Sequence, residues 1–257
     1  MKSFRTYRNN TAQQLLYLNM YKNQTLDFVT SKLKMYTNSR KNKMRMIEAL
    51  LLMDDFVDSS DPDTDLPNSV HAYQTAESIR RIHPKNEELQ ICGLIHDVGK
   101  ILYKFNEPEW AVVGDTFVVG CEYPKTMVFY NLTTYNPDIK NPKYNSKYGI
   151  YKDNCGIENL FLSFGHDQYL YNVLQNNTHR LSKKYQNIIR FHSFYPWHTH
   201  GEYKHFMIPS DYEILQNVRD FNTYDLYSKR DKFILTDEIK QYYAKLLDKY
   251  FPDELNW

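Results

Sequence analysis

The fold is decided by residues 92–100, which read CGLIHDVGK. His96 and Asp97 stand side by side in an apolar pattern that predicts a helix from about Asn86 to Phe105. Burying an imidazole and a carboxylate without partners costs several kcal/mol. A metal ion can partner both groups at once. We therefore expect this helix to lie at the centre of the molecule, beside a metal site.

The pattern around this stretch is mainly helical. Further helices are expected at residues 11–36, 44–57, 68–83, 157–174, 182–194, 210–227 and 236–251. Residues 1–10 are expected to form an extended arm and residues 58–68 an Asp-rich loop. Residues 106–156 are rich in Gly, Pro and Asn, and predict an irregular excursion with short β-like runs at 110–113 and 126–130. The predicted class is all-α.

Composition restricts the function classes. The 257 residues include 32 Lys and Arg against 31 Asp and Glu, a balance that lacks the basic excess of nucleic-acid-binding proteins. No apolar run approaches the roughly 18 residues of a membrane span, and the first residues lack the apolar segment of a secretory signal. Three cysteines without metal or redox spacing fit a reducing compartment. We expect a monomeric cytoplasmic protein without nucleic-acid or membrane partners.

Six ionisable side chains lie among apolar neighbours on five predicted helices. They are His71, His96, Asp97, His166, His192 and Asp225. A single buried histidine is more often a hydrogen-bonded core residue than a ligand, and that alternative stays open for each taken alone. The adjacent pair His96-Asp97 favours metal binding. Since mixed imidazole and carboxylate ligands suit iron, manganese or zinc, the metal also stays open.

Six ligands are too many for one ion that must also bind a substrate, so the set predicts two ions. Adjacent helical residues point about 100° apart, which lets His96 bind one ion while Asp97 bridges to the other. The remaining histidines are expected at the surface, although Pro196 and Trp197 can hold His198 near the site. These are His83, His179, His198, His200 and His205.

The order His71, His96-Asp97, Asp225 resembles the H…HD…D pattern of the HD-domain superfamily, most of whose members are phosphohydrolases. Longer strings resemble the myo-inositol oxygenase family, in one order from about Arg5 to Trp257. They are DPDTDLPNSVHAYQTAE, GLIHDVGK, EPEWAVVGDTF, SFGHDQY, RFHSFYPWHT and FNTYDLYSK. The resemblance implies one HD-domain-like helical bundle over residues 1–257.

The resemblance also implies a cofactor and a reaction. A mixed-valent Fe(II)/Fe(III) pair would cleave the ring of myo-inositol with dioxygen as co-substrate, giving D-glucuronate. His71, His96, Asp97 and Asp225 would hold the first iron. Asp97 would bridge to a second iron held by His166 and His192, which keeps open positions for two ring hydroxyls.

The implied substrate contacts combine donors and acceptors, as a neutral polyol requires. They are Arg5, Asp58, Ser59, Ser60, Lys100, Gly114, Asp115, His192 and Ser193. Ser59 stands where the family often has an acidic residue, so a backbone contact is expected there. Lys100 and Asp97 are the expected catalytic residues. Lys100 lies four residues after His96, and metal charge beside it should lower its pKa toward that of a useful base.

Two alternatives remain at this stage. The same ligands could serve a phosphohydrolase, although Asp58 and Asp115 argue against an anionic substrate. The chain could also be a binding module that has kept the fold and lost catalysis. Oxygen uptake with inositol, phosphate release and iron content distinguish the three.

Overall fold

The computed structural model describes residues 5–9, 11–37, 42–61, 67–228 and 233–257. Parts of the expected arm (1–4 and 10) and of the expected Asp-rich loop (62–66) lie outside these residues. The α-helices are α1 Ala12–Asn23, α2 Leu26–Thr37, α3 Met46–Leu52, α4 Asn68–Ile82, α5 Glu87–Ile95, α6 His166–Gln175, α7 Lys183–Phe191, α8 Tyr195–His198, α9 Asp211–Ser228 and α10 Asp237–Tyr250. The all-α prediction is confirmed.

Shorter 3₁₀ segments connect the helices. They are η1 Met53–Asp55, η2 Val98–Phe105, η3 Glu109–Ala111, η4 Tyr130–Tyr135, η5 Pro137–Lys140, η6 Ile157–Asn159 and η7 Lys204–Phe206. The strands are β1 Lys43–Met44 and β2 Leu255–Asn256, which pair antiparallel with Lys43 opposite Asn256. The Trp257 indole donates to the Met44 carbonyl (3.0 Å), so the C-terminus is fixed to the segment before α3.

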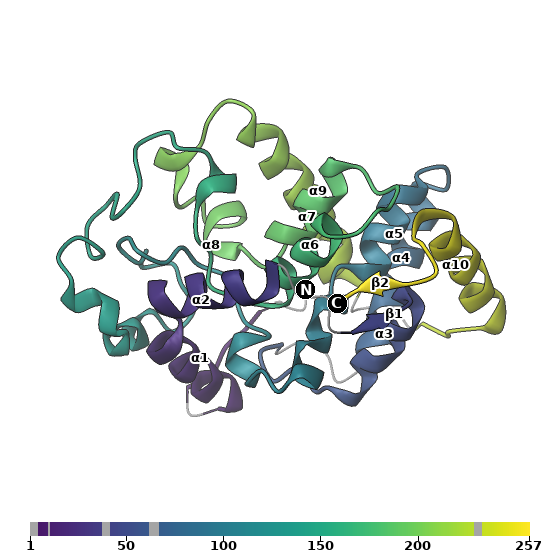
Figure 1. The fold of residues 1–257 in the computed structure, drawn as a ribbon, viewed down its shortest axis with the longest axis horizontal. Coiled ribbons are helices and arrows are strands. Elements are labelled where there is room, and N and C mark those ends of the chain that lie inside the picture. Colours follow the sequence, from purple (N-terminus) through teal and green to yellow (C-terminus); the bar gives the residue numbers. More distant parts are fainter. Residues whose placement is uncertain (1–4, 10, 38–41, 62–66, 229–232) are drawn as a thin grey trace.

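The arrangement places α5 between other helices (Figure 1). It packs along α4 on one side and against α7, α9 and α10 on others, while α6 packs along α7 and η2. Helices α1 and α2 and the excursion 106–156 lie toward one end of the molecule, and α3, α4, α5 and α10 toward the other. Residues from both ends, such as Tyr17 and Ile91, belong to one buried apolar cluster.

The predicted central helix is shorter than expected. α5 ends at Ile95, His96 is its C-cap, and Asp97 lies in a turn before η2. The tighter 3₁₀ winding brings Lys100 over Asp97 rather than over His96, because i and i+3 positions align in a 3₁₀ helix. The Nζ of Lys100 lies 2.8 Å from the Oδ2 of Asp97.

The predicted helix 11–36 is two helices. Gln24 is the C-cap of α1, and its side chain is fully buried. It accepts from the amide of Phe164 (2.9 Å) and donates to the Phe164 carbonyl (2.7 Å). The helix therefore ends at Gln24, where hydrogen bonds to the distant Phe164 take the place of a further helical contact.

Other boundaries also differ. The predicted helix 157–174 begins only at His166, after η6. The predicted start at residue 68 is confirmed for α4, which follows Pro67 without a side-chain hydrogen bond from its N-cap. Asp54 accepts from the Ser69 amide there instead (2.8 Å). The β-like runs at 110–113 and 126–130 are wrong, since the first lies partly in η3 and the second in turns. The helix predicted at 236–251 is α10, and Thr236 is its N-cap, whose side chain accepts from the Ile239 amide.

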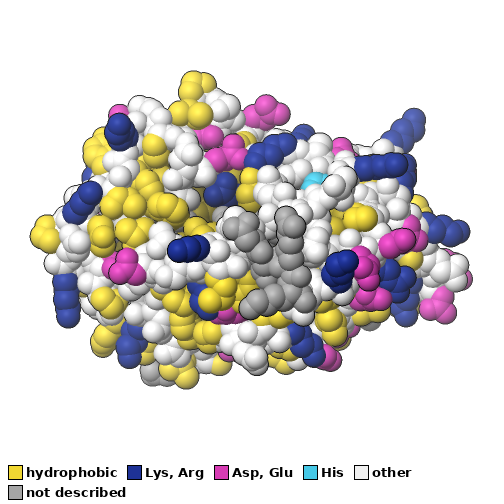
Figure 2. Space-filling model, in the orientation of Figure 1, with side chains coloured by type: hydrophobic (Ala, Val, Ile, Leu, Met, Phe, Trp, Pro, Cys, Tyr) yellow, Lys and Arg dark blue, Asp and Glu magenta, His cyan; other side chains and the backbone are white. Residues whose placement is uncertain are grey.

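In the described part of the chain, none of the helices has the length and apolar character needed to cross a bilayer. Basic and acidic side chains are interspersed over the face drawn in Figure 2, as the net charge of +1 suggests.

Candidate metal centre

Asp97 lies at the centre of the predicted ligand set, and its two carboxylate oxygens face different histidines. Oδ2 is 3.5 Å from the Nε2 of His96, whereas Oδ1 is 3.2 Å from the Nε2 of His166 and 3.6 Å from that of His192. The side chain is 5% exposed. Asp97 therefore joins two groups of potential metal ligands.

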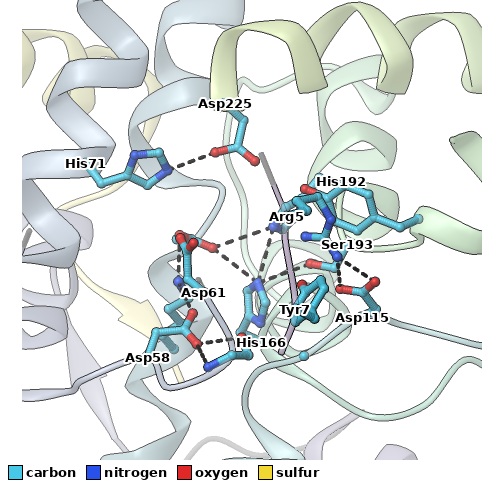
Figure 3. A pocket seen from close by; sticks show the side chains of 15 residues that line it. Arg5, Tyr7, Asp58, Asp61, His71, Asp115, His166, His192, Ser193 and Asp225 are labelled. Atoms are coloured by element: carbon cyan, nitrogen blue, oxygen red, sulfur yellow. Dashed lines mark hydrogen bonds and ion pairs between the residues drawn. The ribbon is translucent and has the colours of Figure 1, made fainter. Parts of the chain in front are cut away.

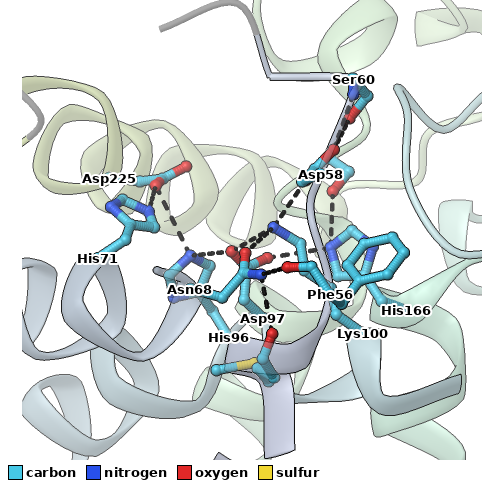
Figure 4. Close-up of polar contacts among 12 residues, drawn as sticks. Phe56, Asp58, Ser60, Asn68, His71, His96, Asp97, Lys100, His166 and Asp225 are labelled. Atoms are coloured by element: carbon cyan, nitrogen blue, oxygen red, sulfur yellow. Dashed lines mark hydrogen bonds and ion pairs between the residues drawn. The ribbon is translucent and has the colours of Figure 1, made fainter. Parts of the chain in front are cut away.

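The first group combines residues of α4, α5 and α9 (Figure 4). The Nε2 of His71 is 2.8 Å from the Oδ1 of Asp225, and the Nε2 of His96 is 3.6 Å from the same oxygen. The donor atoms of His71, His96 and Asp97 all lie within 4.8 Å of one another. Together with Asp225 they surround one small volume.

The second group consists of Asp97 with His166, the first residue of α6, and His192, the C-cap of α7. The two imidazole Nε2 atoms lie 3.2 Å apart. The donor atoms of the three residues again lie within 4.8 Å of one another. The structure thus brings all six predicted ligands together as two groups that share Asp97.

Three of the imidazoles make a hydrogen bond through the Nδ1 atom, on the side of the ring that faces away from the cluster. These bonds orient the three side chains in the way that metal binding requires. The Nδ1 of His96 donates to the Gly93 carbonyl (2.8 Å), that of His166 to Val112 (2.7 Å) and that of His192 to Ile189 (2.8 Å). A backbone carbonyl only accepts, so each Nδ1 carries the proton and each Nε2 presents a lone pair to the cluster. Orientation of this kind is usual for metal-bound histidines.

The charges of the cluster stabilise Asp97 in its ionised form. Burial raises its pKa, but Lys100, His96 and the neighbouring imidazoles of His166 and His192 outweigh burial and hold the pKa well below its usual range. For His96, burial lowers the pKa, while Asp97 and Asp225 raise it, with a net increase. An ionised carboxylate between imidazoles is a suitable bridge for cations.

Gly99 allows the two groups to approach. A Cβ atom on Gly99 would lie 1.9 Å from the carbonyl oxygen of His166, a backbone atom that cannot rotate away. The neighbour of Gly99 is the start of α6, so Gly99 lets η2 bring Asp97 close to His166.

Lys100 is buried between two carboxylates. Its Nζ lies 2.8 Å from both the Oδ2 of Asp97 and the Oδ2 of Asp58. Burial lowers the pKa of Lys100, but the two carboxylates raise it above its usual range. The expected lowering toward a base therefore finds no support in the neighbouring protein groups. Asp58 also accepts from the amide (2.9 Å) and hydroxyl (2.6 Å) of Ser60.

Arg5 reaches the site from the N-terminal arm. Its guanidinium pairs with Asp115 (2.6 Å), which also accepts from the hydroxyl of Tyr17 (2.9 Å). Burial lowers the pKa of Arg5, while Asp115 and the neighbouring tyrosines raise it, so the net shift is upward. Asp115 thus positions Arg5 over the cluster (Figure 3).

A cavity lies between the cluster and this arm. Of the predicted substrate contacts, it is lined by Arg5, Asp58, Ser60, Lys100, Gly114, Asp115, His192 and Ser193. Ser59 is not in this lining, and its amide donates to Glu109 (3.0 Å). The contact expected at Ser59 is therefore not favoured. Gly114, at φ 109°, takes a left-handed conformation that suits glycine.

The sequence interpretation missed four residues. Tyr7, Asp61 and Tyr195 line the cavity, and Asp61 follows directly after the predicted Ser60. His198, expected at the surface, is 1% exposed. Burial is the main cause that lowers the pKa of His198 to about 3, and the charges of Arg5 and Arg219 act in the same direction, although the hydrogen bond to the His192 backbone opposes them. With 23 tyrosines in the chain, no single tyrosine stood out.

Comparison with known proteins agrees with this arrangement. The family model described as Myo-inositol oxygenase matches residues 10–257. The inositol oxygenase of Danio rerio is 46% identical over 239 residues, covering 93% of this chain and 86% of the relative. That of Mus musculus is 44% identical over 263 residues (100% and 92%), and that of Dictyostelium discoideum 43% over 264 residues (100% and 90%). A match of this extent, on a chain whose ligand set converges in space, places the protein in the myo-inositol oxygenase family.

Proposed function

We propose that this chain cleaves the ring of myo-inositol with dioxygen, giving D-glucuronate, at a centre of two iron ions. The observation that carries the proposal is that the two oxygens of the Asp97 carboxylate face different ligand groups. One oxygen lies 3.5 Å from His96 of the first group and the other 3.2 Å from His166 of the second. A carboxylate shared in this way fits two neighbouring cations better than one.

The first iron would be held by His71, His96, Asp225 and Asp97, and the second by His166, His192 and the same Asp97. When bound, a mixed-valent Fe(II)/Fe(III) pair supplies the Lewis acidity and the one-electron chemistry with dioxygen that side chains lack. The second group offers three protein donors against four in the first. The second iron would therefore keep more open coordination positions than the first, which suits a substrate with two adjacent hydroxyls.

The lining of the cavity suits a neutral polyol. Arg5 is paired with Asp115, and Lys100 is paired with Asp58 and Asp97. Both cations that line the cavity are thus already balanced by carboxylates, whereas a phosphate group would need unbalanced positive charge. This balance argues against the phosphohydrolase alternative.

Each polar group has a role that its position supports. Asp58 and Asp115 can accept from ring hydroxyls, Ser60 and Ser193 can donate, and the Gly114 backbone permits close approach. Lys100 acts as a protonated group, since its two carboxylate partners favour the ammonium. It orients the Asp97 bridge and can hold or return a proton at a substrate oxygen.

We extend the proposal to the state of the protein in the cell. The chain would act as a single domain and a monomer in the cytoplasm, without nucleic-acid or membrane partners. Its three free cysteines, two of them buried, and its balanced charge support this. Light scattering coupled to size exclusion measures the mass directly, and a dimer would contradict the monomer.

Anaerobic loading with ferrous iron, followed by myo-inositol and air, tests the reaction. We expect about two irons per chain and one glucuronate per dioxygen consumed. His192→Ala should lose activity, while Lys240→Ala, an exposed change on α10, should keep it. Full activity in His192→Ala, or phosphate release from nucleotides without glucuronate formation, would overturn the proposal.

A further inference from the structure

The ring of Tyr195 lies between the N-terminal arm and the second histidine group. The Cζ of Arg5 is 3.4 Å from the centroid of the Tyr195 ring, a close cation–π contact. The centroid of the His198 ring lies 4.7 Å from that of Tyr195. Both Tyr195 and His198 are buried and belong to α8. One aromatic pair therefore connects Arg5 to the interior.

His198 extends this connection to a predicted metal ligand. Its Nε2 lies 2.9 Å from the carbonyl oxygen of His192, and its Nδ1 lies 3.0 Å from the hydroxyl of Thr199. Since a carbonyl only accepts, Nε2 carries the proton and donates. His192 is thus fixed at two points, at its carbonyl by His198 and at its Nδ1 by the Ile189 carbonyl.

Helix α9 holds the aromatic pair from the other side. The side-chain Nδ2 of Asn222 donates to the hydroxyl of Tyr195 (3.2 Å), and the Nε of Arg219 donates to the carbonyl of His198 (2.6 Å). The same helix carries Asp225 of the first ligand group. The pair is therefore fixed to the helix that helps to build the metal centre.

Arg5 depends on these side-chain contacts for its place. Its backbone has φ 55°, a left-handed conformation that is unfavourable for a residue with a side chain. Such a conformation persists only where the surroundings impose it. Asp115 and the Tyr195 ring are among the contacts that hold the guanidinium, and the Tyr7 ring lies farther away, at 5.4 Å.

We propose that Tyr195 and His198 are positioning residues, which couple the seating of Arg5 over the cavity to the orientation of His192 at the metal centre. The proposal rests on the function given above, because it assigns His192 to a metal. A polyol that engages Arg5 would then stabilise the ligand geometry of the second group through the aromatic pair.

Two pairs of variants test the two contacts on which the proposal depends, that of Arg5 with the Tyr195 ring and that of His198 with the His192 carbonyl. Tyr195→Leu removes the ring and should raise KM for inositol about tenfold, the loss expected for one buried cation–π contact. Tyr195→Phe keeps the ring but loses the hydrogen bond from Asn222, and should raise KM less than Tyr195→Leu does. His198→Phe keeps the ring but loses the donor to His192, and should lower kcat about 10- to 100-fold. His198→Gln places an amide N–H near the same carbonyl and should restore most of kcat.

A double-mutant cycle tests the coupling itself. Arg5→Ala and His198→Phe change residues on opposite sides of Tyr195. Their combined effect on kcat/KM should differ from the product of the single effects by about fivefold or more. Additive effects would contradict coupling through the aromatic pair.

Limited proteolysis gives a readout that needs no metal. Trypsin cleavage after Arg5, followed by mass spectrometry, should be faster in Tyr195→Leu than in the wild type, and the increase should be smaller in Tyr195→Phe, which keeps the ring. Equal rates in Tyr195→Leu and the wild type would overturn the seating of Arg5 on Tyr195. If the wild type bound no iron and oxidised no inositol, the proposed function would be refuted. The contact of Arg5 with Tyr195 would not be refuted by that result, because the proteolysis comparison tests it without metal.

Discussion

Asp97 owes its position to a glycine two residues away. The Cβ-free Gly99 lets η2 contact the carbonyl of His166, and this contact sets the separation of the two histidine groups. The spacing of the metal centre is thus encoded in a residue that binds no metal.

The first prediction follows from this contact. Gly99→Ala should force η2 away from α6, because the new Cβ would lie 1.9 Å from a backbone oxygen. Overpacking of this kind costs about 1–3 kcal/mol. We expect the iron content to fall from about two toward one per chain, measured by elemental analysis. Lys104→Ala, an exposed change on the same η2, should keep both irons. Equal iron in the two variants would show that Gly99 has no such role.

The second prediction concerns Lys100. Lys100→Met leaves Asp58 and Asp97 buried without their cation, which costs about 3–5 kcal/mol of stability. It should also lower kcat/KM for inositol, because Asp97 loses an orienting donor. Denaturant unfolding and steady-state kinetics measure the two effects. Lys104→Met serves as the control, since this lysine pairs at the surface with Asp55. A fully active and stable Lys100→Met would refute the assigned role.

The six predicted ligands could be found from the sequence because each ionisable side chain stood in an apolar pattern. Tyr195 could not be found in this way, and for His198 the sequence indicated only that Pro196 and Trp197 can hold it near the site. The roles proposed for the two residues depend on what the rings contact, which the local sequence does not reveal. The ion pair of Lys100 with Asp58, which opposes the expected lowering of the Lys100 pKa, could not be predicted, because Asp58 lies 42 positions earlier and only the fold brings the two together.

At the level of elements, two breaks build the site. α5 ends at Ile95 so that His96 and Asp97 can face different groups, and α1 ends at Gln24 so that its side chain can bind the Phe164 backbone. Phe164 lies two residues before His166. The Gln24 contact therefore helps to fix the start of α6.

Gln24→Leu should destabilise the protein. It leaves the Phe164 amide and carbonyl without their buried partner, at a cost of about 1–3 kcal/mol for each group. Thermal unfolding measures the loss. Asn23→Ala, which removes an exposed hydrogen bond within α1, should change the midpoint little. A midpoint for Gln24→Leu as high as that of Asn23→Ala would contradict this account.

The stability of the connection between α6 and α7 should depend on pH because of His179. Its Nε2 donates to the Leu174 carbonyl (3.1 Å), and its Nδ1 accepts from the Leu181 amide (3.1 Å). Burial lowers the pKa of His179. The unfolded chain therefore takes up the proton first as the pH falls, and stability is lost below the unfolded pKa of about 6.5.

His179→Asn retains an acceptor for the Leu181 amide but does not titrate. We expect its unfolding free energy to fall less than that of the wild type between pH 7 and pH 5, measured by denaturant unfolding. Parallel pH profiles for the two proteins would remove His179 from this role.

The positions of most helices could be predicted, since their apolar periodicity is local. Some of their ends could not, because a boundary such as the one at Gln24 is set by a partner far along the chain. The pairing of β1 with β2 joins residues more than 200 positions apart and involves only two residues in each strand. Strands this short carry no usable periodicity.

Over the whole molecule, the metal centre is where the two ends of the fold meet. The six predicted ligands lie in or at the ends of α4, α5, α6, α7 and α9, and Arg5 and Asp115 cover them from the N-terminal arm and the excursion. Because the ligands come from so many elements, metal binding should stabilise the entire fold. Adding ferrous iron to chelator-treated protein should raise the thermal midpoint. No change in this midpoint would show that the six side chains do not bind the added metal.

The most direct test is a crystal structure of the iron-loaded protein with an anomalous difference map at the iron edge. The account predicts two peaks about 3.5–4 Å apart, one on each side of the Asp97 carboxylate. One peak lies beside His71, His96 and Asp225, and the other beside His166 and His192. A single peak, or peaks away from Asp97, would contradict it.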